Sequence, residues 1–266
     1  MAPFDAVPFE AVPPDPVPPG GLSLPEELVL LCTDPEQGLL RVSSAAFQRV
    51  IAGAVIAELL LTGGLTVEGR LITGFQPLGP RDEIGADVLA RLDRARKGRR
   101  LGLDAAVRQV PRAAAVRYFR ERLVAEGVLT VERRRILLVP YRARIPVRAT
   151  AGQEIADRIG AGLAAVAGRS GPSGRSGPDG RPEPEGRFGQ EGRSGQEGRA
   201  SGTAGAGLPE RDRQLAGLLW AGQLDRRLYP GRQHAGLRKA AGQVAKDLPI
   251  AQAVRRVVSA DNSGGG

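Results

Sequence analysis

The sequence predicts a mainly α-helical fold class: a single helical domain with two or more β-hairpins, interrupted by a disordered Gly/Arg-rich insert. Helix start and stop signals recur along most of the chain, and apolar runs flank tight turns at two places, as they do in hairpins. Two stretches hold too much Gly, Pro and Arg to bury a core. We therefore expect a disordered tail at 1–21, one domain formed by 22–167 and 208–260, a disordered insert at 168–207 and a disordered tail at 261–266.

Length and composition set the broad class of protein. A chain of 266 residues is long enough to bury a sizeable core. The single cysteine, Cys32, and the single histidine, His234, exclude a disulfide framework and a Cys/His zinc site, since each needs several such ligands. The stretch 1–21 lacks the features of a secretory signal, and the apolar run 50–61 carries Glu58 and is too short to span a bilayer. We expect a cytoplasmic, reduced protein.

The net charge is concentrated in the middle of the chain. The whole sequence has a formal charge of +9, from 38 basic and 29 acidic side chains. Residues 81–150 alone hold 18 basic and 8 acidic side chains, a surplus of 10. A basic surface of this kind favours an anionic partner, which can be a nucleic acid, a membrane face or an acidic protein. A simple solvated surface is the alternative interpretation, because an excess of Arg over Lys also accompanies GC-rich coding.

The beginning of the domain carries two helix signals. Pro25 and the acidic residues after it suit the first turn of a helix, although the apolar run 27–32 is also a plausible strand. Ser43 or Ser44 is placed to cap a second helix that continues to about Thr62. This second helix is apolar around most of its circumference, which is typical of a central core helix.

The remaining elements follow from the positions of Gly and Pro. Pro111 separates two helices, Gly127 ends the second of them, and Pro249 fits the N1 position of the last helix. We expect hairpins at 65–72 and 128–139, and helices at 84–97, 103–109, 112–126, 151–166, 209–222, 232–246 and 250–259.

The insert is a glycine-rich repeat. Gly-Arg pairs recur every six residues from Gly168 to Arg199, and glycine occupies nearly every third position. A collagen triple helix is rejected, because imino acids are few and both ends of the segment join one domain. Phe188 is the only large apolar residue, so the segment cannot offset its conformational entropy by burial.

No catalytic motif stands out in the sequence. It has no glycine-rich phosphate loop, no dinucleotide-binding fingerprint and no Gly-x-Ser-x-Gly elbow. His234 has no carboxylate or nucleophile near it in sequence, and we expect it at a helix end or on the surface. Cys32 ends an apolar run and is expected to be a small core residue. The sequence therefore predicts no enzymatic activity, no cofactor and no metal site.

The segment 112–139 admits three interpretations. A helix followed by a hairpin with three consecutive arginines matches a winged-helix DNA-binding unit, although acidic residues interrupt the would-be reading helix. The same hairpin suits a basic element with an apolar tip that lies on an anionic bilayer. It also suits a solvated hairpin whose arginines protect an edge strand from aggregation.

Five segments, in this order, resemble the Golgi phosphoprotein 3 family. They are Leu24–Leu28 (LPEEL), Ala52–Leu59 (AGAVIAEL), Gly64-Leu65, Arg120–Thr130 (RERLVAEGVLT) and Arg211–Leu219 (RDRQLAGLL). The resemblance covers most of 22–167 and 208–260 and implies a mostly helical domain with β-hairpins. For eukaryotic members it implies a cytosolic peripheral protein that binds phosphatidylinositol 4-phosphate and the tails of Golgi membrane enzymes.

The resemblance also implies a lipid pocket, which the family builds from a tryptophan, an arginine on the central helix and two basic residues before the second hairpin. None of the four is retained here, and the pattern is similar to that of a bacterial-type member. The matching positions hold Ser43, Ala52, Ala113 and Val116. Partial substitutes lie near them in sequence: Arg41, Arg49, Arg112 and Arg117. At the hairpin, Ile136 and Leu137 keep the apolar character of the tip that contacts membranes in the family.

These observations predict a peripheral membrane or adaptor protein that associates reversibly with membranes. Its expected partners are an anionic lipid, with phosphatidylinositol 4-phosphate as the family's ligand, and the tails of membrane proteins. A winged-helix DNA-binding protein that uses 112–126 and 128–139 is the alternative, and only then is nucleic acid a partner. A protein-binding module that uses the tails is a third possibility. The candidate lipid-binding residues are Arg49, Arg112, Arg117, Arg133, Arg134, Arg135, Ile136 and Leu137.

Overall fold

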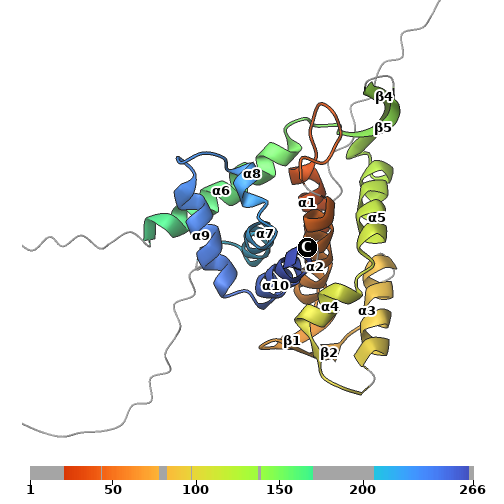
Figure 1. Ribbon diagram of the computed structural model, residues 1–266, viewed down its shortest axis with the longest axis vertical. Coiled ribbons are helices and arrows are strands. Elements are labelled where there is room, and N and C mark those ends of the chain that lie inside the picture. Colours follow the sequence, from red (N-terminus) through yellow and green to blue (C-terminus); the bar gives the residue numbers. More distant parts are fainter. Residues whose placement is uncertain are drawn as a thin grey trace, which may run out of the picture.

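The computed structural model describes residues 21–42, 44–77, 83–96, 98–136, 139–169 and 207–263. Within these ranges the chain forms ten helices and two small antiparallel sheets, so the predicted mainly helical fold class is confirmed (Figure 1). The disordered segments that the sequence predicts fall almost entirely at 1–20, 170–206 and 264–266, which lie outside the described residues.

The elements follow one another in the order drawn in Figure 1. The helices are α1 (Leu24–Cys32), α2 (Ser44–Leu61), α3 (Glu83–Arg96), α4 (Leu103–Gln109), α5 (Arg112–Ala125), α6 (Ala151–Arg169), α7 (Glu210–Ala221), α8 (Asp225–Leu228), α9 (Ala235–Lys246) and α10 (Pro249–Ser263). One sheet has the strand order β1 (Leu65–Glu68), β2 (Leu71–Phe75) and β3 (Leu101–Gly102). The other is the hairpin of β4 (Leu129–Ile136) and β5 (Val139–Pro146).

The segment that sequence reasoning left open between helix and strand is a helix. The backbone N–H and hydroxyl of Ser23 each donate to the Glu26 carboxylate at 2.7 Å, and Pro25 lies in the first turn. This capping box satisfies donors that the first turn of a helix otherwise leaves without partners. It therefore favours the helix over the strand for α1.

One predicted hairpin boundary is wrong, and two helices continue into segments expected to be disordered. The second hairpin runs from 129 to 146 and not to 139, because β5 pairs with all eight residues of β4, including the arginine run. Helix α10 continues to Ser263, and Asp261 pairs with Arg49. Helix α6 continues to Arg169. The short elements β3 and α8 have no counterpart in the prediction.

Helix α2 is the centre of the core, as its apolar circumference predicts. It packs against α1, α5, α7 and α10, with α3 to α5 on one side of it and α6 to α9 on the other (Figure 1). Phe47, Ile51 and Ile56 are completely buried. At Gly53 a Cβ would overlap the side chain of Val254 and lie 3.0 Å from Leu218, so glycine lets α2 approach α7 and α10 closely. None of the described helices combines the length and hydropathy needed to cross a lipid bilayer.

Two buried carboxylates of α1 connect this helix to three others. Glu26 pairs with Arg122 of α5 at 3.1 Å. Glu27 pairs with Arg158 of α6 at 2.7 Å and with Arg211 of α7 at 3.5 Å. Burial raises the pKa of both carboxyls. The hydrogen bonds from Ser23 and the charge of Arg122 counteract the rise at Glu26, and Arg158 and Arg211 counteract it at Glu27. The side chains of α6 and α7 therefore meet on α1, although 170–206 separates these helices in sequence.

Replacing a fully buried side chain of α2 tests its central position. Ile56→Ala is expected to lower the free energy of unfolding by about 2–5 kcal/mol, because it opens a cavity in a packed core. The matched control is Val131→Ala, since Val131 is 43% exposed and its truncation is expected to change stability by less than about 0.5 kcal/mol. Chemical denaturation followed by circular dichroism measures both; equal losses in the two variants would contradict the core position of α2.

Removing the arginine shared by two buried carboxylates tests the ion network. Arg158 also pairs with Asp212 at 3.0 Å, so Arg158→Gln leaves two buried carboxylates short of a partner. We expect Arg158→Gln to lower the free energy of unfolding by about 3 kcal/mol. This is the lower end of the range for a broken buried ion pair, because the Arg158 side chain is 44% exposed. The control Arg91→Gln breaks the exposed pair with Asp87 and is expected to cost less than about 1 kcal/mol.

The loss in Arg158→Gln is also expected to depend on pH. Burial raises the pKa of Glu27 above its unfolded value, and removing Arg158 raises it further. The folded state then binds a proton more readily than the unfolded state, so the free energy of unfolding rises as the pH falls through the raised pKa. The difference in the free energy of unfolding between Arg158→Gln and the parent protein should therefore decrease as the pH is lowered. Chemical denaturation at a series of acidic pH values measures this difference. A gap that widens would refute the buried pairing.

Candidate functional site

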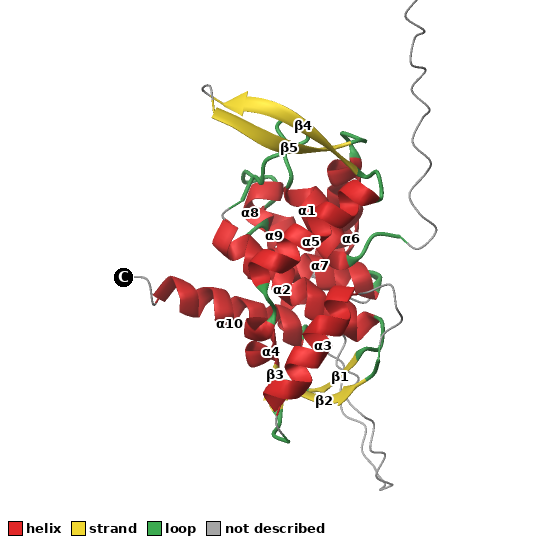
Figure 2. Cartoon of the chain, turned by 90° about the vertical axis from the view of Figure 1, so that its right-hand side faces the viewer, coloured by secondary structure: helices red, strands yellow, loops and turns green. Residues whose placement is uncertain are grey.

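The hairpin β4–β5 follows α5 directly and lies across one end of the helical body, opposite the end that holds β1 and β2 (Figure 2). Its register places Arg133 opposite Arg142, Arg134 opposite Tyr141, and Arg135 opposite Pro140. Cross-strand partners point to the same face of a hairpin, and so do residues two apart on one strand. The three consecutive arginines therefore do not share a face.

One face of the hairpin is exposed and basic. Arg133, Arg135 and Arg142 share this face and are all exposed, and we call these three residues the basic face. None of them lies within ion-pair distance of a carboxylate in the described part of the chain. Val131 lies on the same face and is 43% exposed, as large an exposure as any big apolar residue described. The basic face therefore presents uncompensated positive charge beside an apolar side chain.

The other face of the hairpin is anchored to the turn that follows α1. Arg134 pairs with Glu132 at 3.0 Å and donates a hydrogen bond to the carbonyl of Glu36. The Tyr141 hydroxyl donates to the carbonyl of Gln37 at 3.2 Å. Arg134 is consequently engaged with the protein itself, in contrast to its neighbours on either side.

The anchoring turn has a rigid geometry. The backbone N–H groups of Gln37 and Glu36 donate to Asp34, and these bonds, together with Arg41, hold the pKa of Asp34 below its usual range. Gly38 has a φ of +66°, and a Cβ there would lie 2.6 Å from the backbone nitrogen of Arg144. Glycine therefore allows β5 to pack directly on the turn.

Two further arginines near the base of the hairpin, Arg120 of α5 and Arg144 of β5 itself, have no carboxylate partner among the described residues. Arg120 of α5 donates to the carbonyl of Gly38 at 3.2 Å. The Nε atoms of Arg120 and Arg144 are buried and have no hydrogen-bond partner. Burial lowers the pKa of Arg120, and the nearby charge of Arg144 lowers it further. Positive charge that the described residues leave uncompensated thus continues from the basic face to the base of the hairpin.

The predicted site residues at the start of α2 and α5 form a separate cluster. Arg49 is 8% exposed, and its Nε lies 2.5 Å from Oδ2 of Asp261; Arg112 lies 3.8 Å from the same oxygen. The hydrogen bond from Arg49 lowers the pKa of Asp261. The 14 residues of α5 rise by about 20 Å, so this cluster is well separated from the hairpin. The structure therefore does not bring Arg49 and Arg112 together with Arg133, Arg134 and Arg135.

The other predicted positions differ in exposure. Arg117 is exposed on α5, Ala113 is exposed, Val116 is half-buried, and Ala52 is completely buried in α2. Ile136 is the last residue of β4, whereas Ser43 and Leu137 lie outside the described residues. Sequence reasoning missed Asp261, Arg120, Arg142 and Arg144 as parts of these clusters. Recognising Arg142 and Arg144 required the longer hairpin, because both lie beyond its predicted end.

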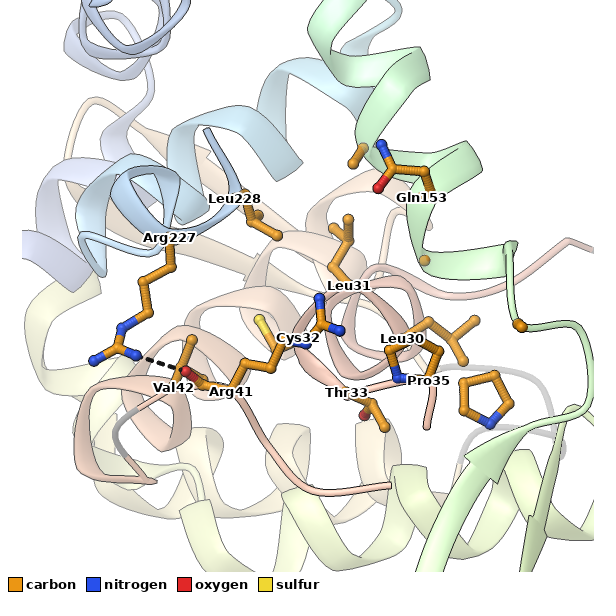
Figure 3. Close-up of a pocket in the computed structure, with 14 residues that line it drawn as sticks. Leu30, Leu31, Cys32, Thr33, Pro35, Arg41, Val42, Gln153, Arg227 and Leu228 are labelled. Atoms are coloured by element: carbon orange, nitrogen blue, oxygen red, sulfur yellow. Dashed lines mark hydrogen bonds between the residues drawn. The ribbon is translucent and has the colours of Figure 1, made fainter. Parts of the chain in front are cut away.

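A small cavity lies between α1, α6, α8 and the end of β5 (Figure 3). Its volume is about 130 Å³, and apolar side chains such as Leu30 and Leu228 line much of it. Arg227 donates to the carbonyl of Arg41 at 2.9 Å across its rim. Cys32 also lines it, and burial raises the pKa of this thiol to about 12. The thiol therefore stays protonated and is a poor nucleophile, in keeping with the expected core role.

Fold and site together define a helical protein with a projecting basic hairpin. The family model for Golgi phosphoprotein 3 (GPP34) matches residues 24–260, so the chain belongs to this family. The resemblance seen in the sequence is thereby confirmed. Among curated proteins, no individual relative matches the chain.

Substitution of Gly38 tests how the hairpin is held. Gly38→Ala adds a methyl group in contact with the Arg144 backbone, so we expect β5 to separate from the turn and its amides to exchange hydrogen faster. Gly69→Ala is the matched control, because Gly69 has a similar φ of +60° but open space around its Cβ position. The control carries only the cost of the left-handed conformation, about 1 kcal/mol. Hydrogen exchange at the β5 amides that is equally fast in both variants would contradict direct packing at Gly38.

Proposed function

We propose that this protein is a peripheral membrane-binding adaptor whose hairpin lies on anionic lipid. The observation that carries the proposal is the basic face, where Arg133, Arg135 and Arg142 are exposed together without carboxylate partners among the described residues. The sequence continues from the end of β4 with two apolar residues, Ile136 and Leu137, of a type suited to shallow insertion between headgroups.

The expected strength suits a reversible association. Each arginine near an anionic surface contributes about 1 kcal/mol, so the three residues of the basic face contribute about 3 kcal/mol. This electrostatic contribution weakens as salt shortens the Debye length. Partial insertion of the apolar tip adds to it without anchoring the protein permanently.

Family membership supports a lipid role. The resemblance implies that eukaryotic members bind phosphatidylinositol 4-phosphate and the tails of Golgi membrane enzymes, and we propose both classes of partner here. In this chain the headgroup would be recognised mainly through charge at the hairpin. Arg49 and Arg112, two of the four partial substitutes for the family's pocket residues, are already paired with Asp261.

The DNA-binding alternative finds less support. Two arginines of the would-be reading helix are engaged within the protein: Arg120 donates to Gly38, and Arg122 pairs with Glu26 and Glu126. A reading helix needs such side chains free to reach base edges. Arg117 remains exposed on this helix.

Liposome flotation tests the proposal. Arg133→Gln/Arg135→Gln is expected to reduce flotation with vesicles containing phosphatidylserine or phosphatidylinositol 4-phosphate by about tenfold or more, since it removes about 2 kcal/mol of attraction. Arg134→Gln is the matched control, because it removes one charge from the opposite face of the same strand; its effect should be clearly smaller. Leu137→Asp should also weaken binding if the tip inserts.

Three results would argue against the membrane assignment. One is wild-type protein that fails to float at low salt. Another is binding that high salt leaves unchanged, since contacts by the basic face must be screened. The third is a shift of duplex DNA by protein that ignores vesicles, which would favour the winged-helix alternative.

A further inference from the structure

A second basic region lies far along the chain from the hairpin, where the end of α7 meets α8, α9 and α10. A pocket of about 260 Å³ opens there. Its lining includes four cationic side chains and two neutral polar ones: Arg226, Arg238, Lys239, Arg255, Trp220 and Gln223. No residue of the basic face and no other predicted site residue contributes to it.

The charge in this pocket is not balanced. Asp225 is the single carboxylate that lines it, so four cations and one carboxylate give a surplus of three positive charges. Asp225 is 5% exposed, and burial raises its pKa. The backbone N–H of Arg226 and the charges of Arg226 and Arg238 lower the pKa of Asp225 against the effect of burial. The side chains of Arg226, Lys239 and Arg255 form no ion pair with a carboxylate in the described part of the chain. The fold therefore gathers cations here that the described protein does not neutralise.

Two of the cations are held in place by the protein. The guanidinium carbon of Arg255 lies 4.1 Å from the centre of the Trp220 ring, in a cation–π contact. At Gly242 a Cβ would lie 2.9 Å from Nε1 of Trp220, so glycine makes room for the indole. Arg238 donates to the carbonyls of Tyr229 and Gly231 at 2.6 and 2.8 Å. Arg226 and Lys239 are exposed at the rim, free to meet a ligand.

The backbone at the pocket is strained. Gln223 has a φ of +57° and is the non-glycine residue with positive φ in the described ranges. It lies just after the end of α7, a position that glycine usually occupies because a side chain there costs about 1 kcal/mol. Gln223 instead places an exposed amide, with two N–H donors, at the pocket. Strain of this kind is typical of functional sites.

We propose that this pocket binds a phosphate monoester. Guanidinium groups donate paired N–H bonds that match phosphate oxygens, and an ammonium adds a mobile charge. The volume exceeds that of a phosphate group alone, so the organic part of the ester also fits. The ester can belong to a soluble metabolite or to a lipid headgroup. The site is independent of the proposed hairpin function, because the two share no residue.

Trp220 is the single tryptophan of the sequence, so its fluorescence reports on this pocket directly. Titration with inorganic phosphate, the group that a soluble ester and a lipid headgroup share, is expected to change the Trp220 emission saturably. Titration with chloride at equal ionic strength is expected to leave the emission unchanged. Arg226→Gln/Lys239→Gln should weaken binding by at least about tenfold, as expected for lost hydrogen bonds between charged groups. Both side chains are exposed, so the thermal midpoint should stay the same.

The matched control is Arg232→Gln/Lys246→Gln, which removes one arginine and one lysine from exposed positions outside the pocket. The affinity of this control variant for inorganic phosphate should equal that of the parent protein. Three outcomes would overturn the proposal. The emission change does not saturate, chloride produces the same change, or the two double variants lose it to the same extent.

Vesicles distinguish the two sources of the ester. If phosphatidic acid vesicles change the Trp220 emission through Arg226 and Lys239 while glycerol 3-phosphate does not, the ligand is a lipid headgroup; the reverse identifies a soluble ester. The Arg133→Gln/Arg135→Gln protein should keep its response to glycerol 3-phosphate or phosphate. Failure of the hairpin function would therefore leave this site intact, and loss of this site would leave flotation through the basic face intact.

Discussion

The rest of the structure depends on the burial of two carboxylates in α1. An unpaired charge in an apolar interior is very costly, so Glu26 and Glu27 are tolerated only where cations reach them. Those cations are Arg122, Arg158 and Arg211, from α5, α6 and α7. Because burial still raises the pKa of both carboxyls, the network adds specificity more than stability. It requires three helices from distant parts of the sequence to meet on one short helix.

The position of α1 in turn fixes the candidate membrane surface. The turn at 34–38 begins two residues after α1 ends, and it holds the hairpin through Glu36, Gln37 and the close approach at Gly38. Arg120 joins α5 to the same turn. One face of the hairpin is thereby attached to the body, and alternation along the strands leaves Arg133, Arg135 and Arg142 exposed on the other face. The basic face is thus a consequence of how the end of α1 is held.

Local signals in the sequence predicted the helices well, because capping residues, Gly stops and Pro starts act within a few positions. Contacts between distant residues could not be predicted in this way. The hairpin was placed too short, because its second strand depends on pairing through Arg142 and Arg144. Arg49 was identified as a candidate, but its partner Asp261 lies 212 residues away in a segment expected to be a tail. The pocket at Trp220 could not be predicted from local signals either, because its cations come from three different helices.

The meaning of the positive charge follows from which cations the fold leaves without partners. Helix α10 shows the distinction within a few residues: Arg256 pairs with Asp104 at 2.6 Å, and Asp261 neutralises Arg49, whereas Arg255 stacks on Trp220 without a described carboxylate partner. Paired arginines hold helices together and have little attraction left for a ligand. At the hairpin and at the Trp220 pocket, several cations without an ion-pair partner among the described residues lie close together. An anion that binds at the hairpin or at the Trp220 pocket displaces water and does not compete with a carboxylate of the protein. These two places therefore favour anionic partners.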